Sequence, residues 1–205
     1  MNGKFFALPE EKRQRIINAG FRVFSSGAYK KCPVAEIAAE AGISKSLLFH
    51  YFRDKLELYM FLWDEAARLT MEYLNRYGCY EPGDLFEMME RGMRAKLEIM
   101  RNYPAMAAFS IRAFYEKEPN LQAEIQESYK KYFGMKAEKA LAGLDPEKFI
   151  PGLDLGRMYR EMYLASVGHL WESVQWGKNV EPERLEADFK QMLDFWKSVY
   201  LRREE

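Results

Sequence analysis

The chain has 205 residues, with 31 Lys and Arg, 31 Asp and Glu and only two cysteines, so its formal net charge at pH 7 is zero. This length is enough for one large domain or two of unequal size, and Cys32 and Cys79 form no CxxC pattern, which argues against a disulfide framework and a zinc site. The first residues offer only the short apolar run FFAL, and no stretch approaches the ~18 apolar residues of a membrane span, so we expect a cytoplasmic protein that does not enter the membrane.

The charges are distributed unevenly along the chain. Residues 1–55 hold ten Lys and Arg against five Asp and Glu, whereas the remainder holds 21 against 26. Such a split is typical of a basic N-terminal segment that binds a polyanion, followed by an acidic remainder that does not. A chance distribution of surface charges is the alternative.

Three short helices are predicted first. An apolar stripe at helical spacing begins after Pro9 and continues up to Gly27. Pro33 starts a second helix that Gly42 ends, and Ser44 can N-cap the third. The pattern predicts two helices joined by a tight turn at a glycine.

Six longer helices are predicted after this segment. Asp54 and Glu57 have the spacing of a capping box, and Asp84 can cap a later helix. The predicted ranges are Lys55 to Tyr77, Leu85 to Asn102, Pro104 to Phe114, Leu121 to Leu141, Leu155 to Trp176 and Pro182 to Arg202. Because no run of alternating β-branched residues competes, the sequence predicts an all-α protein with about nine helices.

The two helices around Gly42 have the plan of a helix-turn-helix, whose second helix enters the major groove of DNA. Ser44, Lys45 and Ser46 place short donors and a cation near the start of that helix, where they can meet base edges and phosphates. Lys55 adds a cation to the start of the next helix. A plain helix pair packed inside a bundle, with solvated lysines, is the alternative.

The segment GFRVFSSGAYKKCPVAEIAAEAGISKSLLFHYFRDKLELY resembles the N-terminal DNA-binding region of the TetR family of bacterial transcription regulators, over roughly residues 10 to 60. The matching residues lie in the three short helices and the turns between them: Ala19, Phe24, Gly27, Tyr29, Ile37, Ala38, Ala41, Gly42, Ile43, Ser44, Leu48, Tyr51, Phe52, Lys55 and Leu58. The resemblance implies a three-helix DNA-binding domain at residues 1–54 and a larger helical effector-binding and dimerisation domain at residues 55–205.

The resemblance also implies which residues contact bases and phosphates. They are Ser44, Lys45, Ser46, Leu47, Phe49, His50, Tyr51 and Lys55. Two positions depart from the family pattern: Phe49 stands where tyrosine is common, and Cys32-Pro33 stand where a hydroxyl residue usually opens the second helix. An apolar contact with a thymine methyl or a sugar is expected at Phe49.

The remainder of the chain is rich in large, soft apolar side chains, with 11 of the 12 methionines and all four tryptophans after residue 55. Such helices can enclose a cavity for an apolar or aromatic ligand, and ordinary core packing is the alternative. Helical spacing, together with the resemblance, predicts a pocket lined by Met60, Trp63, Ala67, Met89, Met93, Phe109, Tyr129, Phe133, Tyr163 and Val167. No cluster of Arg or Lys indicates an anionic ligand.

The helix predicted from Leu155 is apolar nearly all round, and the last helix carries its own apolar stripe. Two copies of the chain could cover these surfaces by packing as a four-helix bundle. We therefore expect a homodimer that forms through the last two helices.

These features predict a homodimeric transcriptional regulator, a repressor that binds a palindromic operator in double-stranded DNA and is released by a small apolar or aromatic effector. An architectural or interaction module that binds DNA without an effector is the alternative. An enzyme is disfavoured, because the sequence has no nucleophile elbow, glycine-rich phosphate loop or metal-ligand spacing. We expect no catalytic residues, cofactor or metal.

Overall fold

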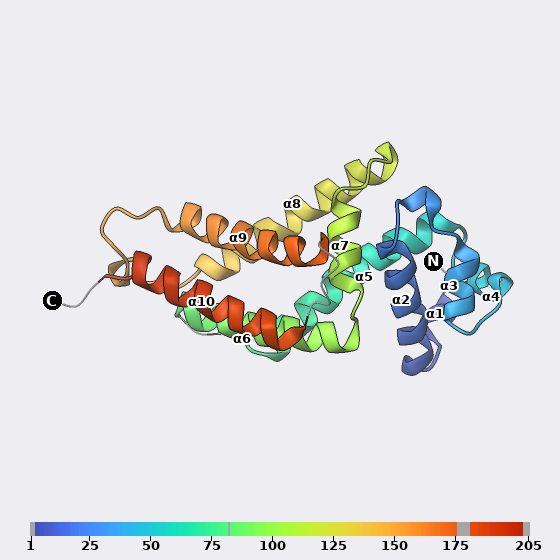
Figure 1. The fold of residues 1–205 in the computed structure, drawn as a ribbon, viewed down its shortest axis with the longest axis horizontal. Coiled ribbons are helices and arrows are strands. Elements are labelled where there is room, and N and C mark those ends of the chain that lie inside the picture. The colour runs from blue at the N-terminus through green and yellow to red at the C-terminus, as the bar shows by residue number, and fades with distance from the viewer. Residues whose placement is uncertain (1–2, 82, 176–180, 203–205) are drawn as a thin grey trace. The chain divides into compact units, whose positions relative to one another are not determined.

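The computed structural model describes residues 3–81, 83–175 and 181–202 (Figure 1). Within these ranges the chain forms helices and no strand, apart from one isolated β-bridge between Phe149 and Leu201. The α-helices are α1 (Gly3–Phe6), α2 (Glu10–Ser25), α3 (Val34–Glu40), α4 (Lys45–Tyr51), α5 (Lys55–Arg76), α6 (Leu85–Asn102), α7 (Met106–Phe114), α8 (Pro119–Leu141), α9 (Leu155–Gln175) and α10 (Pro182–Tyr200). The prediction of an all-α protein is confirmed.

The helices α2 to α10 match the predicted ranges, with ends displaced by about two residues at most. The predicted end of α9 at Trp176 lies outside the described residues. The caps predicted at Ser44, Asp54 and Asp84 are present: each side chain accepts a hydrogen bond from a backbone N–H in the first turn of its helix, at 2.8–3.1 Å. Local capping chemistry therefore sets where α4, α5 and α6 begin.

The chain folds into two compact units. Unit 1 comprises Met1–Leu69 and Asn102–Tyr129, and unit 2 comprises Thr70–Arg101 and Lys130–Glu205. The helices α5 and α8 each contribute residues to both units. The predicted boundary after residue 54 falls at the start of α5. It stays a prediction that residues 1–54 bind DNA and that residues 55–205 bind the effector and form the dimer.

Aromatic rings form the core of unit 1. The ring centroid of Phe24 in α2 lies 4.8 Å from that of Tyr59 in α5, and the centroid of Phe21 lies 5.2 Å from that of Phe109 in α7. All four side chains are at most 1% exposed. These contacts pack α2 against both α5 and α7, so that the first predicted helix and a later one share a single core.

The short helix α1 was not predicted, because four residues are too few to show a hydrophobic period. Its Phe5 is fully buried, and the ring centroid of Phe5 lies 5.0 Å from that of Phe52 and 5.2 Å from that of Phe61. α1 contacts α4 and therefore supports the helix expected to meet DNA.

Gly42 forms the turn between α3 and α4 with a φ of 67°, in the left-handed region. The N–H groups of Gly42 and Ile43 donate to the carbonyls of Ala39 and Ala38, at 3.1 Å and 2.9 Å. This pattern closes the C-terminus of α3. A Cβ at Gly42 would meet no atom within 4 Å, so the backbone conformation, not space, favours glycine.

The substitution Gly42→Ala should lower the free energy of unfolding by about 1 to 2 kcal/mol, because an L-residue with a Cβ is strained in this conformation. Urea unfolding followed by circular dichroism measures the change. Gly42→Asn should lower the free energy of unfolding by less, since Asn tolerates the left-handed region better. Equal losses for Ala and Asn would contradict this explanation of the turn.

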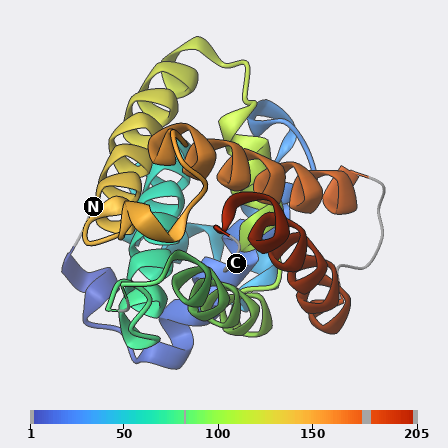
Figure 2. The ribbon, with the colours of Figure 1, turned by 90° about the vertical axis from the view of Figure 1, so that its left-hand side faces the viewer.

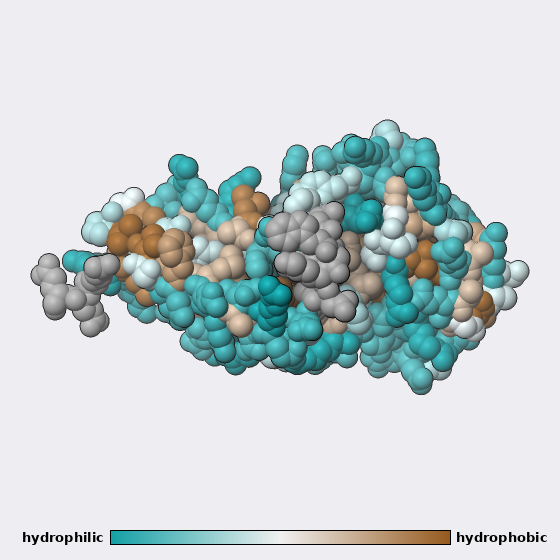
Figure 3. All heavy atoms as spheres, in the orientation of Figure 1, coloured by the Kyte–Doolittle hydropathy of each residue, from teal (hydrophilic) through white to brown (hydrophobic). Residues whose placement is uncertain are grey.

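In unit 2, α9 and α10 pack beside each other (Figure 2). The Nε2 atom of His169 in α9 lies 3.2 Å from Oδ2 of Asp188 in α10, and Nζ of Lys197 lies 3.2 Å from Oε1 of Glu90 in α6. Large apolar side chains stay exposed on this pair: Leu164, Trp171, Phe195 and Val199. Figure 3 shows hydrophobic residues gathered beside the C-terminal end of α10.

Candidate DNA-binding and effector sites

The helix α4 exposes one face. Its exposed residues are Lys45, Ser46, Phe49 and His50. On the opposite side Leu48 and Tyr51 are buried, and the ring centroid of Tyr51 lies 5.9 Å from that of Phe5. Leu47 is half-buried between the two sides. The buried side fixes the helix in unit 1, so the exposed side is presented to solvent in a defined orientation.

The chemistry of the exposed face suits a DNA groove. Nζ of Lys45 lies 5.8 Å from the ring centroid of Phe49, and the Ser44 hydroxyl, which caps α4, keeps its own O–H to donate. Nζ of Lys4 in α1 lies 3.1 Å from Nε2 of His50. Sequence reasoning missed Lys4, because only the fold of α1 brings this lysine beside α4.

Two of the predicted DNA contacts are turned inward in the structure. Tyr51 is 5% exposed. The Lys55 ammonium donates to the backbone carbonyl of Tyr29 and lies 4.5 Å from the centroid of the Tyr29 ring. Burial lowers the pKa of Lys55 below its usual value. DNA contacts through these two side chains stay predictions, and a phosphate contact by Lys55 requires its side chain to turn outward.

Other kinds of site have little support in the described part of the chain. No group of three or more His, Cys, Asp or Glu side chains there is placed to hold a metal ion. None of the described helices combines the length and apolar character that a membrane crossing requires. Cys32 and Cys79 are free thiols, and both are buried.

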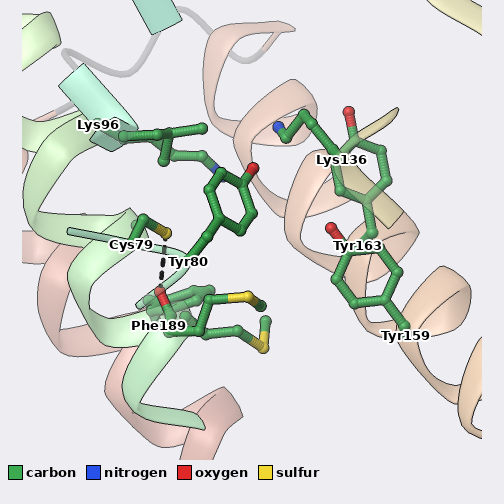
Figure 4. A pocket seen from close by; sticks show the side chains of 11 residues that line it. Cys79, Tyr80, Lys96, Lys136, Tyr159, Tyr163 and Phe189 are labelled. Atoms are coloured by element: carbon green, nitrogen blue, oxygen red, sulfur yellow. Dashed lines mark hydrogen bonds between the residues drawn. The ribbon is translucent and has the colours of Figure 1, made fainter. Parts of the chain in front are cut away.

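A pocket of about 60 Å³ lies within unit 2 (Figure 4). Its polar lining is Cys79, Tyr80, Lys96, Lys136, Tyr159 and Tyr163. Its other lining residues are Leu74, Met88, Met89, Gly92 and Phe189. The helices α5, α6, α8, α9 and α10 and the turn after α5 all contribute, so the pocket is enclosed by several elements, as small-molecule sites are.

The structure divides the ten predicted ligand contacts between the two units. Met89 and Tyr163 line the pocket, and the ring centroid of Phe133 lies 4.8 Å from that of Tyr163. Met93 and Val167 belong to unit 2 but are not among the lining residues. The others belong to unit 1: Met60, Trp63, Ala67, Phe109 and Tyr129. Ligand contacts by the residues that do not line the pocket stay predictions.

Two cations in this pocket were not expected, since the sequence shows no cluster of basic residues there. Lys96 lies in α6 and Lys136 in α8, and the fold brings both into the lining. Burial, and to a lesser extent the nearby charge of Lys96, lowers the pKa of Lys136 to about 7. Burial also raises the pKa of Tyr159 to about 12 and that of the Cys79 thiol above its usual value. All three shifts report a pocket that is poorly hydrated.

The helices α3 and α4, joined by the turn at Gly42, have the arrangement of a helix-turn-helix DNA-binding domain. Residues 16–60 match the family model described as bacterial regulatory proteins, tetR family. The match covers the three-helix segment, and over this segment the chain has the DNA-binding domain of the TetR family. Residues 10 to 60, on which the sequence resemblance rests, contain this whole match.

Individual relatives agree with this assignment. The chain is 29% identical to the HTH-type transcriptional regulator AcrR of Shigella flexneri over 79 residues, which are 37% of this chain and only 35% of that protein. It is 26% identical to the HTH-type transcriptional regulator RutR of Escherichia coli over 156 residues, 72% of this chain and 73% of RutR. The structure of SmeT, the repressor of the Stenotrophomonas maltophilia multidrug efflux pump SmeDEF, superposes with a TM-score of 0.66 and 17% identity, covering 97% of this chain and 93% of SmeT. This last likeness concerns the fold alone.

Proposed function

We propose that the protein is a homodimeric repressor that binds a palindromic operator through α4 and is released by a small effector bound in unit 2. The observation that carries the proposal is the exposed face of α4, with Lys45, Ser46 and His50 on a helix whose other side is buried. A helix held in this way can lie in the major groove and read base edges. The proposal places the protein in the cytoplasm, with the DNA.

Exposed apolar side chains on α9 and α10 support the dimer. Leu164 is 50% exposed and Phe195 is 63% exposed, and Trp171 and Val199 are each 41% exposed. Large apolar groups that stay exposed on adjacent helices are typical of a surface that a partner covers. Two copies of the α9 and α10 pair can cover each other as a four-helix bundle, with a two-fold axis that matches a palindromic operator.

The pocket supports an effector. It is lined by flexible Met88 and Met89 and by three tyrosines, so it can adapt its shape to an apolar or aromatic group while the hydroxyls orient it. The helices α5 and α8 provide pocket residues Leu74 and Lys136 and also extend into unit 1. A ligand that shifts either helix would therefore act on the unit that contains α4.

A third helix connects the DNA-binding helices to the rest of unit 1. Arg112 in α7 donates from Nε to the carbonyl of Ser25 at 2.7 Å, and the backbone N–H of Tyr29 donates to Oε2 of Glu116 at 2.8 Å. The helix α5 offers a first link, because it carries pocket residue Leu74 and also contributes residues to unit 1. The helix α7 also contacts α2 extensively. A conformational change in unit 2 could therefore alter the position of α4 through α5 or through α7.

Trp63→Ala should weaken the response to ligand more than it weakens operator binding without ligand. Trp63 Nε1 donates to Ser128 Oγ at 3.1 Å and so joins α5 to α8, and both helices contribute residues to both units. Operator affinity measured with and without a saturating ligand gives the coupling free energy, which we expect to be about 1 to 3 kcal/mol in the wild type. The coupling is reciprocal, so operator DNA should lower ligand affinity by the same factor. Tyr115→Ala, an exposed aromatic elsewhere in unit 1, is the control. An unchanged coupling in Trp63→Ala would exclude this route.

The effector is tested first without DNA. The melting temperature is measured against a panel of apolar and aromatic compounds, and each compound that raises it is then added to the operator complex. The proposal predicts that stabilising compounds release the operator. Stabilising compounds that bind and leave operator affinity unchanged would favour the alternative, a DNA-binding module without an effector.

A further inference from the structure

The pocket of unit 2 contains two lysines, and none of its described lining residues is a carboxylate. Lys96 comes from α6 and Lys136 from α8, and Figure 4 shows their amine ends and the Tyr80 hydroxyl turned toward the same region. Lys136 is only 7% exposed. Lysine side chains are seldom buried to this extent unless they are paired with an opposite charge.

The structure gives these two ammonium groups no polar partner among the residues it describes. Lys136 makes neither a hydrogen bond nor an ion pair there, and its contacts are with aromatic rings, 5.2 Å from the centroid of Tyr132 and 5.4 Å from that of Tyr163. No Asp or Glu is among the described lining residues. The titratable groups around Lys136 are Cys79, Tyr80, Lys96, Tyr132, Tyr159 and Tyr163. Burial raises the pKa of Cys79, Tyr80, Tyr132 and Tyr159, so these four groups are neutral at pH 7.

Two neighbouring ammonium groups without a counter-charge, one buried and one half-buried, are unfavourable. Burial and the mutual repulsion of Lys96 and Lys136 both favour loss of a proton from Lys136. An anion placed between the two nitrogens would offset the repulsion and provide the missing acceptors. The same two cations reject a ligand that brings a positive group.

The remaining lining decides what else the ligand contains. Met88, Met89 and Phe189 add apolar surface to the same lining. A cavity of about 60 Å³ has room for a carboxylate or phosphate group. Unbranched methionine side chains can move aside for an apolar chain or ring.

We propose that the effector is an amphiphilic anion, whose carboxylate or phosphate group binds between Lys96 and Lys136 and whose apolar part lies against Met88 and Met89. This inference rests on the proposed function where it calls the ligand an effector. The ligand class itself depends only on the pocket.

The test compares three probes that share a six-carbon chain: hexanoate, hexyl phosphate and the neutral hexanamide. Binding to the full-length protein without DNA is measured by isothermal titration calorimetry at pH 7. We expect at least one anion to bind at least about tenfold more tightly than hexanamide, a margin that one charge-assisted contact can supply. Which anion binds more tightly identifies the carboxylate or the phosphate as the natural group. Equal binding of all three, or binding of neither anion, would overturn the proposal.

Variants locate the anion. Lys136→Met and Lys96→Met keep most of the side-chain volume and remove the charge, so each should abolish most of the preference for the anion. Lys131→Met removes an exposed lysine from the same helix as Lys136 and should leave the preference unchanged. Circular dichroism shows whether each variant is folded. A folded Lys136→Met protein that still prefers the anion would overturn the assignment of the site.

The pH dependence provides a second readout. Because the pKa of Lys136 is about 7 in the empty pocket, an anion that binds the charged lysine raises this pKa, so binding takes up protons above pH 7. The affinity for hexanoate, which is fully ionised over this range, should therefore fall from pH 6 to pH 8.5, and calorimetry in buffers of different ionisation enthalpy should report proton uptake. Hexanamide should show neither effect. Anion affinity that is independent of pH would contradict a role for Lys136.

Operator release is measured separately, so that the two proposals can fail independently. Anion binding that depends on both lysines but leaves the operator bound would uphold the ligand class and refute the regulatory function. Release of the operator by hexanamide alone would uphold the regulation and refute the anionic ligand.

Discussion

Phe195→Asp should convert the protein to a monomer and lower its operator affinity by roughly a hundredfold. Phe195 is the most exposed large apolar side chain among the described residues and lies on α10, in the surface assigned to the dimer. A carboxylate there would be buried without a partner in the assembled bundle, at a cost of several kcal/mol. Loss of the dimer leaves one α4 per molecule, and a single half-site contact is weak.

Sedimentation at micromolar concentration and fluorescence anisotropy with labelled operator measure the two effects. Tyr115→Asp is the matched control, because Tyr115 is 62% exposed but lies in unit 1, outside the proposed interface. The control should stay dimeric and bind operator normally. A Phe195→Asp protein that remains a dimer would place the interface elsewhere.

Lys45→Ala should reduce operator affinity by about 1 to 3 kcal/mol and relax the preference at particular base pairs, because an exposed lysine on the recognition face can donate to guanine in the major groove. Binding is measured to a set of operators that each differ by one base pair. The change in base-pair preference should be concentrated at one base pair in each half-site.

Two further variants test the assignment. Arg94→Ala removes an exposed cation from unit 2 and should leave every affinity unchanged. Lys55→Ala, by contrast, should weaken binding to all operators alike and reduce the salt dependence by about one unit of slope, if its side chain turns outward to a phosphate. If Lys45→Ala lowers all affinities by one factor, Lys45 contacts the backbone and not a base.

The sequence predicts the helices well because their ends depend on neighbouring residues. Ser44, Asp54 and Asp84 cap their helices through their own side chains, and Gly42 closes α3 through its own φ. Such signals are read within a few residues, so α2 to α10 appear near their predicted positions. The helix α1 was missed because its stability depends on the burial of Phe5 among distant rings.

The pocket was harder to predict, because pocket lining depends on how helices pack. Lys96 and Lys136 are 40 residues apart on two helices, and neither stands in a basic run. Helical spacing placed Met89 and Tyr163 on inward faces, but could not show that Trp63 and Phe109 belong to another unit than these two. The inward turn of Lys55 likewise depends on the Tyr29 carbonyl, which only the fold brings near.

Selection of operator sequences from a random pool of duplex DNA tests the central claim most directly. The purified protein is mixed with the pool, the bound duplexes are sequenced, and the stoichiometry of the best binder is measured. If the protein binds as a dimer with two copies of α4, the enriched duplexes should contain inverted repeats whose half-sites are about one helical turn apart or somewhat more. Two chains should bind to each duplex. Enrichment of a single asymmetric motif, or no enrichment above the starting pool, would contradict it.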